Sequence, residues 1–432
     1  MSKFKICTSR ISACVNIGLK QSVIKRCYSV YGWGNGLSAQ LGFGQTIEVA
    51  TKPLDLPNFE DLAIKQLQSG VKHSVALVQE EGKGRLYTWG SNDYCQSGYF
   101  SELETGVGLF DSEEKLIEEP MQLRDGAEAE NFKQIAIGDF HNLALTDEGK
   151  VFAWGGGILG YGTELFEIQM FPVKKLLDYK VESVYATGNT SLAVVDNNGL
   201  KEIMMWGYLD TTAKGDVSKA LEPVKLLAGD KAFQFQQITS VALNQHNLAI
   251  SGINLEGKDE VQVFGSLNNI TPGYIPYCPE FQADAPLLSE SVALPSLLSK
   301  NTAAKQVQLC DDFLLILNDD GKVTLHSILE PSQEPIEFAN ISGINSPIRS
   351  MYVRKNSAIF ATPTEVLTYS AIPPVKKEKG SILSIFFTTK EEKEINPRPL
   401  IDTILTMPPN VQYINEPMIV SCGWDFFIVA TK

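Results

Sequence analysis

The sequence predicts an all-β protein: a seven-bladed β-propeller with terminal-strand closure, preceded by a cleavable transit peptide. Three observations support this fold. Two short strand-like motifs alternate along the 432 residues, each motif occurs seven times, and the chain opens on one motif and ends on the other. A unit of a few short strands cannot bury both of its faces alone, whereas seven such sheets stacked radially bury one another.

The first motif is a short strand that ends in an aromatic or ring residue followed by glycine or serine. Its clearest copies are 30–34 and 86–90, and each is followed by a tail of the form Gln-x-Gly, at 40–42 and 96–98. Further copies lie at 151–155, 203–207, 261–265, 323–327 and 366–370. Such runs, bounded by glycine-rich turns, are typical of β-strands.

The second motif begins Gly-x-x-His in its clearest copies, at 70–77 and 138–145. Later copies lie at 188–195, 243–250, 310–317, 353–360 and 423–430. Short turns such as 147–150 connect the two motifs as hairpins. Because the chain opens on the first motif and ends on the second, the terminal strands are expected to pair within one blade and leave no open sheet edge.

The two motifs together resemble the regulator of chromosome condensation repeat. The resemblance extends over 29–432 and is specific in the first three units. It implies a seven-bladed propeller. It also implies two kinds of function, since mitochondrial members of this family support assembly of respiratory complexes or of the mitochondrial ribosome, and guanine-nucleotide exchange is the activity that named the family.

The N-terminal segment differs in charge from the rest of the chain. Residues 1–28 contain six basic residues and no acidic ones, interleaved with apolar and hydroxyl side chains. This composition predicts a mitochondrial transit peptide. Arg26, Tyr28 and Ser29 resemble a site of the matrix processing peptidase, with cleavage after Tyr28, which would place the protein in the matrix or on the matrix face of the inner membrane. The alternative is a basic tail on a cytosolic protein.

Removal of this segment would take the formal net charge from −14 to −20. An acidic surface argues against binding to nucleic-acid phosphates and favours basic protein partners. Residues 29–432 are expected to form one monomeric propeller.

The sequence contains no constellation that predicts chemistry. Of the four histidines, His73, His141 and His246 are assigned to one equivalent repeat position, which would spread them around the ring as structural hydrogen-bonding residues, and His326 is assigned to a tryptophan position. No Cys-x-x-Cys pair or phosphate-binding glycine motif is present. We therefore expect no catalytic, cofactor or metal site, and no enzyme.

Two insertions stand apart from the repeats. Residues 273–300 are rich in proline and leucine and are expected to form a surface excursion. Within 376–399, an apolar run lies between lysines; its candidate docking residues are Ile382, Leu383, Ile385, Phe386 and Phe387. Such a run is typical of contact with a partner or with the surface of the inner membrane. Burial as an extra strand or helix remains equally open.

The functional expectation is a non-enzymatic mitochondrial interaction scaffold, an assembly factor for a respiratory complex or the mitochondrial ribosome. The alternative is a guanine-nucleotide exchange factor for a mitochondrial GTPase.

Overall fold

The structure is a computed structural model. It describes residues 29–56, 59, 62–98, 116–123, 129–211, 217–229, 231–244, 246–266, 285–310, 313–342, 346–354, 357–363, 365–370, 403–406, 419–423 and 426–431. The expected transit peptide, with Arg26 and Tyr28, and the docking residues of the 376–399 insertion lie outside these ranges.

The described strands form seven sheets, which we number as blades. Blade 1 contains β3 (Ala63–Ser69), β4 (His73–Glu80), β5 (Lys83–Ser91) and β6 (Leu116–Gln122). Blade 2 contains β7 (Phe132–Ile137), β8 (His141–Thr146), β9 (Val151–Ile158) and β10 (Glu164–Pro172). Blade 3 contains β11 (Lys180–Thr187), β12 (Thr190–Asn197), β13 (Leu200–Asp210), β14 (Val217–Ala228), β15 (Lys231–Ala232), β16 (Gln234–Phe235) and β20 (Ser291–Ala293).

The second half of the chain repeats the four-stranded pattern. Blade 4 contains β17 (Gln237–Leu243), β18 (Asn247–Ile253), β19 (Asp259–Gly265) and β21 (Ser296–Lys300). Blade 5 contains β22 (Gln306–Leu309), β23 (Phe313–Leu317), β24 (Val323–Ser327) and β25 (Ile336–Glu337). Blade 6 contains β26 (Ser350–Arg354), β27 (Ser357–Ala361), β28 (Glu365–Ser370) and β29 (Thr403–Thr406). Two short helical segments, η4 (Lys174–Leu176) and α2 (Phe338–Ser342), lie between strands.

Blade 7 joins the two ends of the chain. It contains β2 (Ile47–Asp55), β1 (Ser29–Gly36), β31 (Phe426–Thr431) and β30 (Ile419–Cys422), in that order. β1 pairs with β31 in an antiparallel register that runs from Ser29 opposite Thr431 to Gly34 opposite Phe426. N-terminal and C-terminal strands therefore share one sheet, as the sequence predicts.

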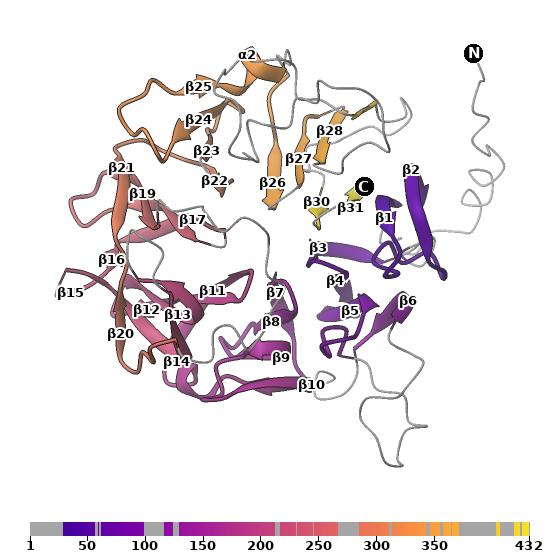
Figure 1. The fold of residues 1–432 in the computed structure, drawn as a ribbon, viewed down its shortest axis with the longest axis horizontal. Helices are drawn as coiled ribbons and strands as arrows, with labels where there is room; N and C mark the ends of the chain where they lie inside the picture. The colour runs from indigo at the N-terminus through magenta and orange to yellow at the C-terminus, as the bar shows by residue number, and fades with distance from the viewer. Residues whose placement is uncertain are drawn as a thin grey trace, which may run out of the picture.

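The sheets are arranged around a common centre (Figure 1). The innermost strand of each blade contacts the innermost strand of the next blade, from β3 through β7, β11, β17, β22 and β26 to β30. β30 in turn contacts β3, which closes the ring. The prediction of an all-β propeller closed by its terminal strands is confirmed.

The expectation that 273–300 forms a surface excursion is in part wrong. Within it, β20 pairs in parallel with β14 at the edge of blade 3, and β21 supplies the fourth strand of blade 4. Both strands are too short for their pairing to be visible as a pattern in the sequence. The segment therefore joins two neighbouring blades.

The tail motif connects each of the first blades to the next. Trp89 of blade 1 is fully buried, and its Nε1 donates a hydrogen bond to the carbonyl oxygen of Gln40, in the tail that follows β1 (2.8 Å). Gly42 of the same tail has φ +75°, and a Cβ built there would lie 3.0 Å from the Trp89 ring. The tail glycines Gly98 and Gly160 lie against Trp154 and Trp206 in the same way. Glycine is required because a side chain would displace the tryptophan of the next blade.

The substitution Gly42→Ala tests this packing against a matched control. Gly82 also has a positive φ, +82°, but a Cβ there would meet nothing within 4 Å. Gly82→Ala should cost about 1 kcal/mol of unfolding free energy through backbone strain alone. Gly42→Ala should cost a further ~1–3 kcal/mol through overpacking. Chemical denaturation measures both values, and equal losses would contradict the packing role of the tail.

Candidate functional site

Two histidines lie at the start of the second strand in blades 1 and 2, and both are buried. The Nε2 atom of His73 lies 2.8 Å from Oδ1 of Asn142, which follows His141 in the next blade. Since Nδ2 of Asn142 donates to the carbonyl oxygen of Gln96 (2.7 Å), its Oδ1 is the acceptor, and His73 carries its proton on Nε2. His141 repeats the link, with Nε2 2.8 Å from Oγ of Ser191 in blade 3. Each histidine therefore connects one blade to the next.

The assignment of His246 to this position is wrong. His73 pairs with Gly90 and His141 with Gly155, and the residue paired with the corresponding Gly265 is Asn247. His246 precedes that position by one residue, in the turn between β17 and β18. In the sequence, His246 and Asn247 fit the repeat spacing to within one position. Only the strand register shows that Asn247 holds the histidine position. His326 pairs with Leu314 in the register in which Trp89 pairs with Ser74. His326 therefore holds the tryptophan position, as the sequence predicts.

Burial keeps both histidines neutral. Together with the nearby Arg354 charge, and against the hydrogen bond to Asn142, burial lowers the pKa of His73 to about 3. Burial and Arg354 lower the pKa of His141 to about 4. Both imidazoles are thus uncharged at neutral pH, and the Nε2 atom of each has a fixed partner, which fits a structural role. Among the described residues, no group of three or more His, Cys, Asp or Glu side chains could hold a metal ion.

An arginine that the sequence analysis did not single out lies in the middle of the ring. Arg354 is the last residue of the inner strand of blade 6, in the register position that Gly70 and Gly138 hold in blades 1 and 2. At those glycines, a Cβ would lie 2.2 Å and 2.1 Å from the ring of the blade's own histidine. In blade 6, the histidine position is occupied by Ser357. The smaller side chain leaves room for a large residue at the glycine position.

The Arg354 side chain reaches across the ring to two blades that are not its neighbours. Its Nη1 donates to the carbonyl oxygen of Ser69 in blade 1 (2.6 Å). Its Nη2 donates to the carbonyl oxygen of Gly138 in blade 2 (2.7 Å) and to Oδ1 of Asp139 (3.2 Å). Blade 7 lies between blades 6 and 1 in the ring. One guanidinium therefore links blades 6, 1 and 2, at the ends of their innermost strands β26, β3 and β7.

The charge of Arg354 is buried but compensated. The arginine is 5% exposed and Asp139 is 6% exposed. Burial opposes the charged form, yet Tyr352 and Asp139 raise the pKa of the arginine above its ordinary value. We call Arg354, Asp139, Tyr352, His73 and His141 the central cluster. Its hydrogen bonds join blades to one another, an arrangement suited to holding the ring together.

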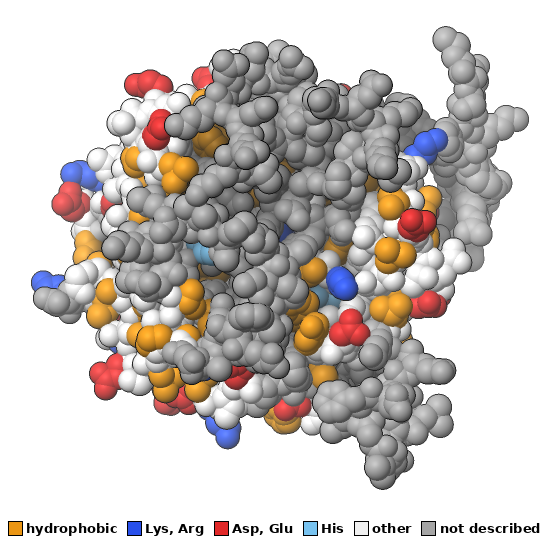
Figure 2. Space-filling view, viewed as in Figure 1, with side chains coloured by type: hydrophobic (Ala, Val, Ile, Leu, Met, Phe, Trp, Pro, Cys, Tyr) orange, Lys and Arg blue, Asp and Glu red, His pale blue; other side chains and the backbone are white. Residues whose placement is uncertain are grey.

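The remaining candidate residues lie apart from this cluster. Ser29 opens β1, is exposed, and pairs with Thr431. Within the described residues, no helix has the length and apolar content needed to cross a membrane. On the face shown in Figure 2, the hydrophobic, basic and acidic side chains of the described residues are interspersed.

Comparison with known proteins agrees with the repeat pattern. A family model described as "Regulator of chromosome condensation (RCC1) repeat" matches residues 29–77 and 83–145, and a second model of that description matches 132–160. The chain carries RCC1 repeats. The matched residues span the units in which the Gly-x-x-His and Gln-x-Gly patterns are complete.

Curated relatives match over part of their length. The mouse protein "Regulator of chromosome condensation" is 31% identical over 174 residues, which cover 38% of this chain and 36% of that protein. The Arabidopsis thaliana "RCC1 domain-containing protein RUG3, mitochondrial" is 30% identical over 212 residues, 46% of this chain and 42% of that protein. The chain thus spans less than half of the length of either relative.

Solved structures share the propeller fold at low identity. Human WBSCR16 superposes with a TM-score of 0.61 at 16% identity, over 94% of this chain and 99% of that chain. Prp20p from Saccharomyces cerevisiae also has a TM-score of 0.61, at 14% identity, over 94% of this chain and 91% of that chain. These likenesses concern the fold.

The buried histidines should make stability depend on pH. In the unfolded chain each binds a proton below a pKa of about 6.5, whereas the folded values are about 3 and 4. As pH falls below about 6.5, the unfolded state takes up protons that the folded state refuses. Each histidine should therefore lower the unfolding free energy by about 1.4 kcal/mol per pH unit, until pH reaches its folded pKa.

Denaturation at several pH values between 7 and 5 measures this loss. The double variant His73→Gln with His141→Gln removes both titrating groups while keeping side-chain donors, so its stability should fall less steeply than that of the wild type. Parallel curves for the two proteins would refute neutral burial of the histidines.

Removal of the arginine should destabilise the ring strongly. Arg354→Met leaves Asp139 as an unpaired buried charge and leaves the carbonyl groups of Ser69 and Gly138 without this donor. Loss of one partner of a buried pair costs about 3–5 kcal/mol. Arg349→Met, at an exposed arginine one strand length earlier, is the control and should change stability by less than about 0.5 kcal/mol. Adding Asp139→Asn to Arg354→Met should restore part of the loss, and a purely additive loss would contradict the pairing.

Proposed function

We propose that the chain is a non-enzymatic interaction scaffold of mitochondria, an assembly factor for a respiratory complex or for the mitochondrial ribosome. The proposal rests on one observation: the polar residues at the centre of the ring form hydrogen bonds between blades. His73, His141 and Arg354 are buried and bonded between blades. They hold the ring together, so binding would fall to its outer faces and insertions, as is usual for loops on a rigid scaffold.

Charge supports a basic client. The chain has a formal net charge of −14, and without its first 28 residues the value is −20. Complementary charge speeds encounter and selects partners. The solved structure of Prp20p is described with "its Binding Properties to Gsp1p and Histones". A propeller of the same fold thus binds histones, which are rich in lysine and arginine.

The mitochondrial location is proposed from the first 28 residues and from RUG3. That relative is described as mitochondrial. We propose that residues 1–28 are a transit peptide recognised through Arg26, Tyr28 and Ser29, and that 29–432 form the mature propeller in the matrix or on the matrix face of the inner membrane. The apolar run at 382–387 is the proposed contact with a partner or with that membrane.

Affinity purification from isolated mitochondria tests the proposal. A C-terminally tagged chain should begin at Ser29, and it should retain respiratory-complex subunits or ribosomal proteins that are released as salt is raised from about 0.1 M to 1 M, because salt screens charge. A chain that keeps Met1, or that retains no assembly client, would contradict the proposal. Deletion of 380–390 is the matched variant for membrane contact, and unchanged membrane fractionation would exclude that role for the insertion.

Guanine-nucleotide exchange is the second candidate, because the mouse protein Regulator of chromosome condensation is 31% identical over 174 residues. Catalytic amounts of the chain should then accelerate nucleotide release from a mitochondrial GTPase. Under the scaffold proposal, the release rate stays unchanged.

A further inference from the structure

Blade 3 carries an additional strand on its outer edge. Within the segment 285–293, β20 runs parallel to β14. The backbone nitrogen of Lys225 in β14 donates to the carbonyl oxygen of Glu290 (3.1 Å). Further along the edge, the backbone nitrogen of Leu288 donates to the carbonyl oxygen of Lys219 (2.8 Å). The segment is therefore held by backbone groups that β14 turns outward.

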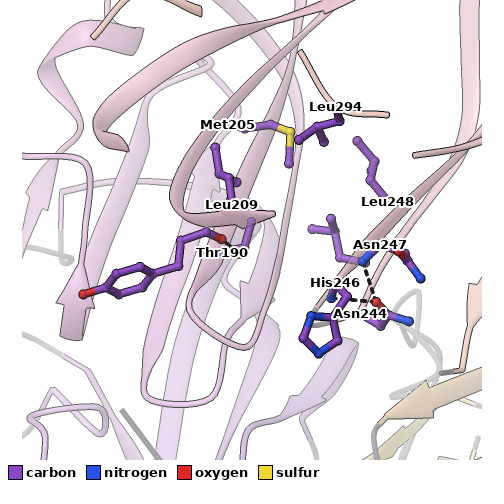
Figure 3. Close-up of a pocket in the computed structure, with 10 residues that line it drawn as sticks. Thr190, Met205, Leu209, Asn244, His246, Asn247, Leu248 and Leu294 are labelled. Atoms are coloured by element: carbon purple, nitrogen blue, oxygen red, sulfur yellow. Dashed lines mark hydrogen bonds between the residues drawn. The ribbon is translucent and has the colours of Figure 1, made fainter. Parts of the chain in front are cut away.

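The same segment also buries apolar side chains. Val224 of β14 is fully buried, Val292 of β20 belongs to the same apolar cluster, and Leu288 packs against that cluster. Leu294, just after β20, and Met205 both line the small cavity between blades 3 and 4 (Figure 3). Backbone pairing combined with pockets for a few side chains is the way in which sheet edges bind extended peptides.

The outer strand of blade 1, β6, matches β14 in register. Thr88 pairs with Met121 in blade 1 as Met205 pairs with Val224 in blade 3, one residue before each tryptophan. Both strands have Glu-Pro directly before this position, at 119–120 and 222–223. By the same register, Leu116 and Gln122 of β6 correspond to Lys219 and Lys225 of β14.

The edge of β6 is open where the edge of β14 is covered. The N–H of Leu123 donates to Leu86 of β5, and successive residues of a strand turn in opposite directions, so the N–H of Gln122 points away from β5. No described strand pairs with β6 on that side. Met121 is 36% exposed, whereas Val224 is fully buried. β6 thus presents the backbone groups and the apolar side chain that β14 uses to hold β20.

Carboxylates surround this open edge. Glu118 and Glu119 are exposed on β6 itself. Glu80 of the neighbouring β4 accepts a hydrogen bond from Nε2 of Gln122 (3.3 Å). Complementary charge selects partners, so an added strand here should carry lysine or arginine.

We propose that the outer edge of blade 1 binds an extended basic segment of a partner protein, which adds a strand parallel to β6 as β20 does to β14. Its backbone pairs with Leu116 and Gln122, and its apolar side chains, spaced as Leu288 and Val292 are, pack beside Met121. The proposal rests on the proposed scaffold function for the basic character of the partner, and it assigns that partner a site.

Methyl NMR of the methionine-labelled full chain tests the proposal, because the Met121 methyl group reports on this edge. The variant Met121→Leu identifies the signal by its loss. The probe is a synthetic peptide with the sequence of 285–294 and the changes Ser289→Lys and Glu290→Lys. It should shift the Met121 signal to saturation with a Kd on the order of 1 mM, while the signal of the buried Met351 in blade 6 stays in place.

Two further peptides separate backbone pairing from charge. A peptide with N-methylleucine at the Leu288 position lacks the N–H that would bind Leu116, and it should bind about threefold more weakly, as expected for one lost hydrogen bond. The peptide without the two lysine changes should bind about twofold more weakly at ~0.1 M salt. Equal affinity in the first comparison would overturn the added strand, and equal affinity in the second would overturn the basic partner.

Two variants at Gln122 complete the test. Blade 2 has Pro172 at the equivalent position, so the fold accepts proline there. Gln122→Pro removes the outward N–H and should weaken binding of the lysine peptide about threefold, whereas Gln122→Ala keeps that N–H and should bind as the wild type does.

An unmoved Met121 signal, or equal binding by Gln122→Pro and Gln122→Ala, would overturn the proposal. The comparison of peptides needs no variant, so it decides the question even if Gln122→Pro does not fold. Because these titrations use the purified chain, their failure is distinct from a failure to capture a client from mitochondria.

Discussion

The structure depends on the pairing of β1 with β31. Each blade covers the faces of its two neighbours, so a ring with one unpaired junction would expose two apolar faces at once. The pairing from Ser29 to Gly34 joins residues nearly 400 positions apart and places β31 between β1 and β30. Because the contact is so distant in sequence, its loop-closure entropy must be offset by the burial that closure completes. Arg354 strengthens the same closure from the centre, by joining blade 6 to blades 1 and 2 across blade 7.

The links between blades are regular at the start of the chain and irregular later. From blade 7 to blade 3, a tail glycine lies against the tryptophan of the next blade, and from blade 1 to blade 3 a buried histidine reaches the next blade. Beyond that point Thr190 replaces the histidine and Phe264 the tryptophan. Apolar packing then carries the contact, as in the cluster that joins blades 4 and 5. Arg354 lies where the repeat pattern fails, at a position that glycine holds in blades 1 and 2.

The fold could be predicted because the burial requirement repeats seven times, so each copy of a motif supports the others. The cluster at the centre could not, for reasons visible in particular residues. His246 and Asn247 are adjacent, and only pairing with Gly265 shows which one holds the histidine position. Arg354 lies in a unit that has lost most of the repeat motif. The only sequence feature that could have indicated its place at a glycine position is the small residue Ser357, three residues later. The contacts of Arg354 with Ser69 and Gly138 are far apart in sequence and follow from ring geometry alone.

Native-state hydrogen exchange tests most directly whether terminal closure holds the ring. If closure and the rest of the ring open together, the amides of β1 and β31 should exchange with the same opening free energy as those of the inner strands β3 and β7. The account predicts one shared value for all four strands. Exchange of β1 and β31 at a much lower free energy, while β3 and β7 stay protected, would show that the ring stands without its closure and would contradict the account.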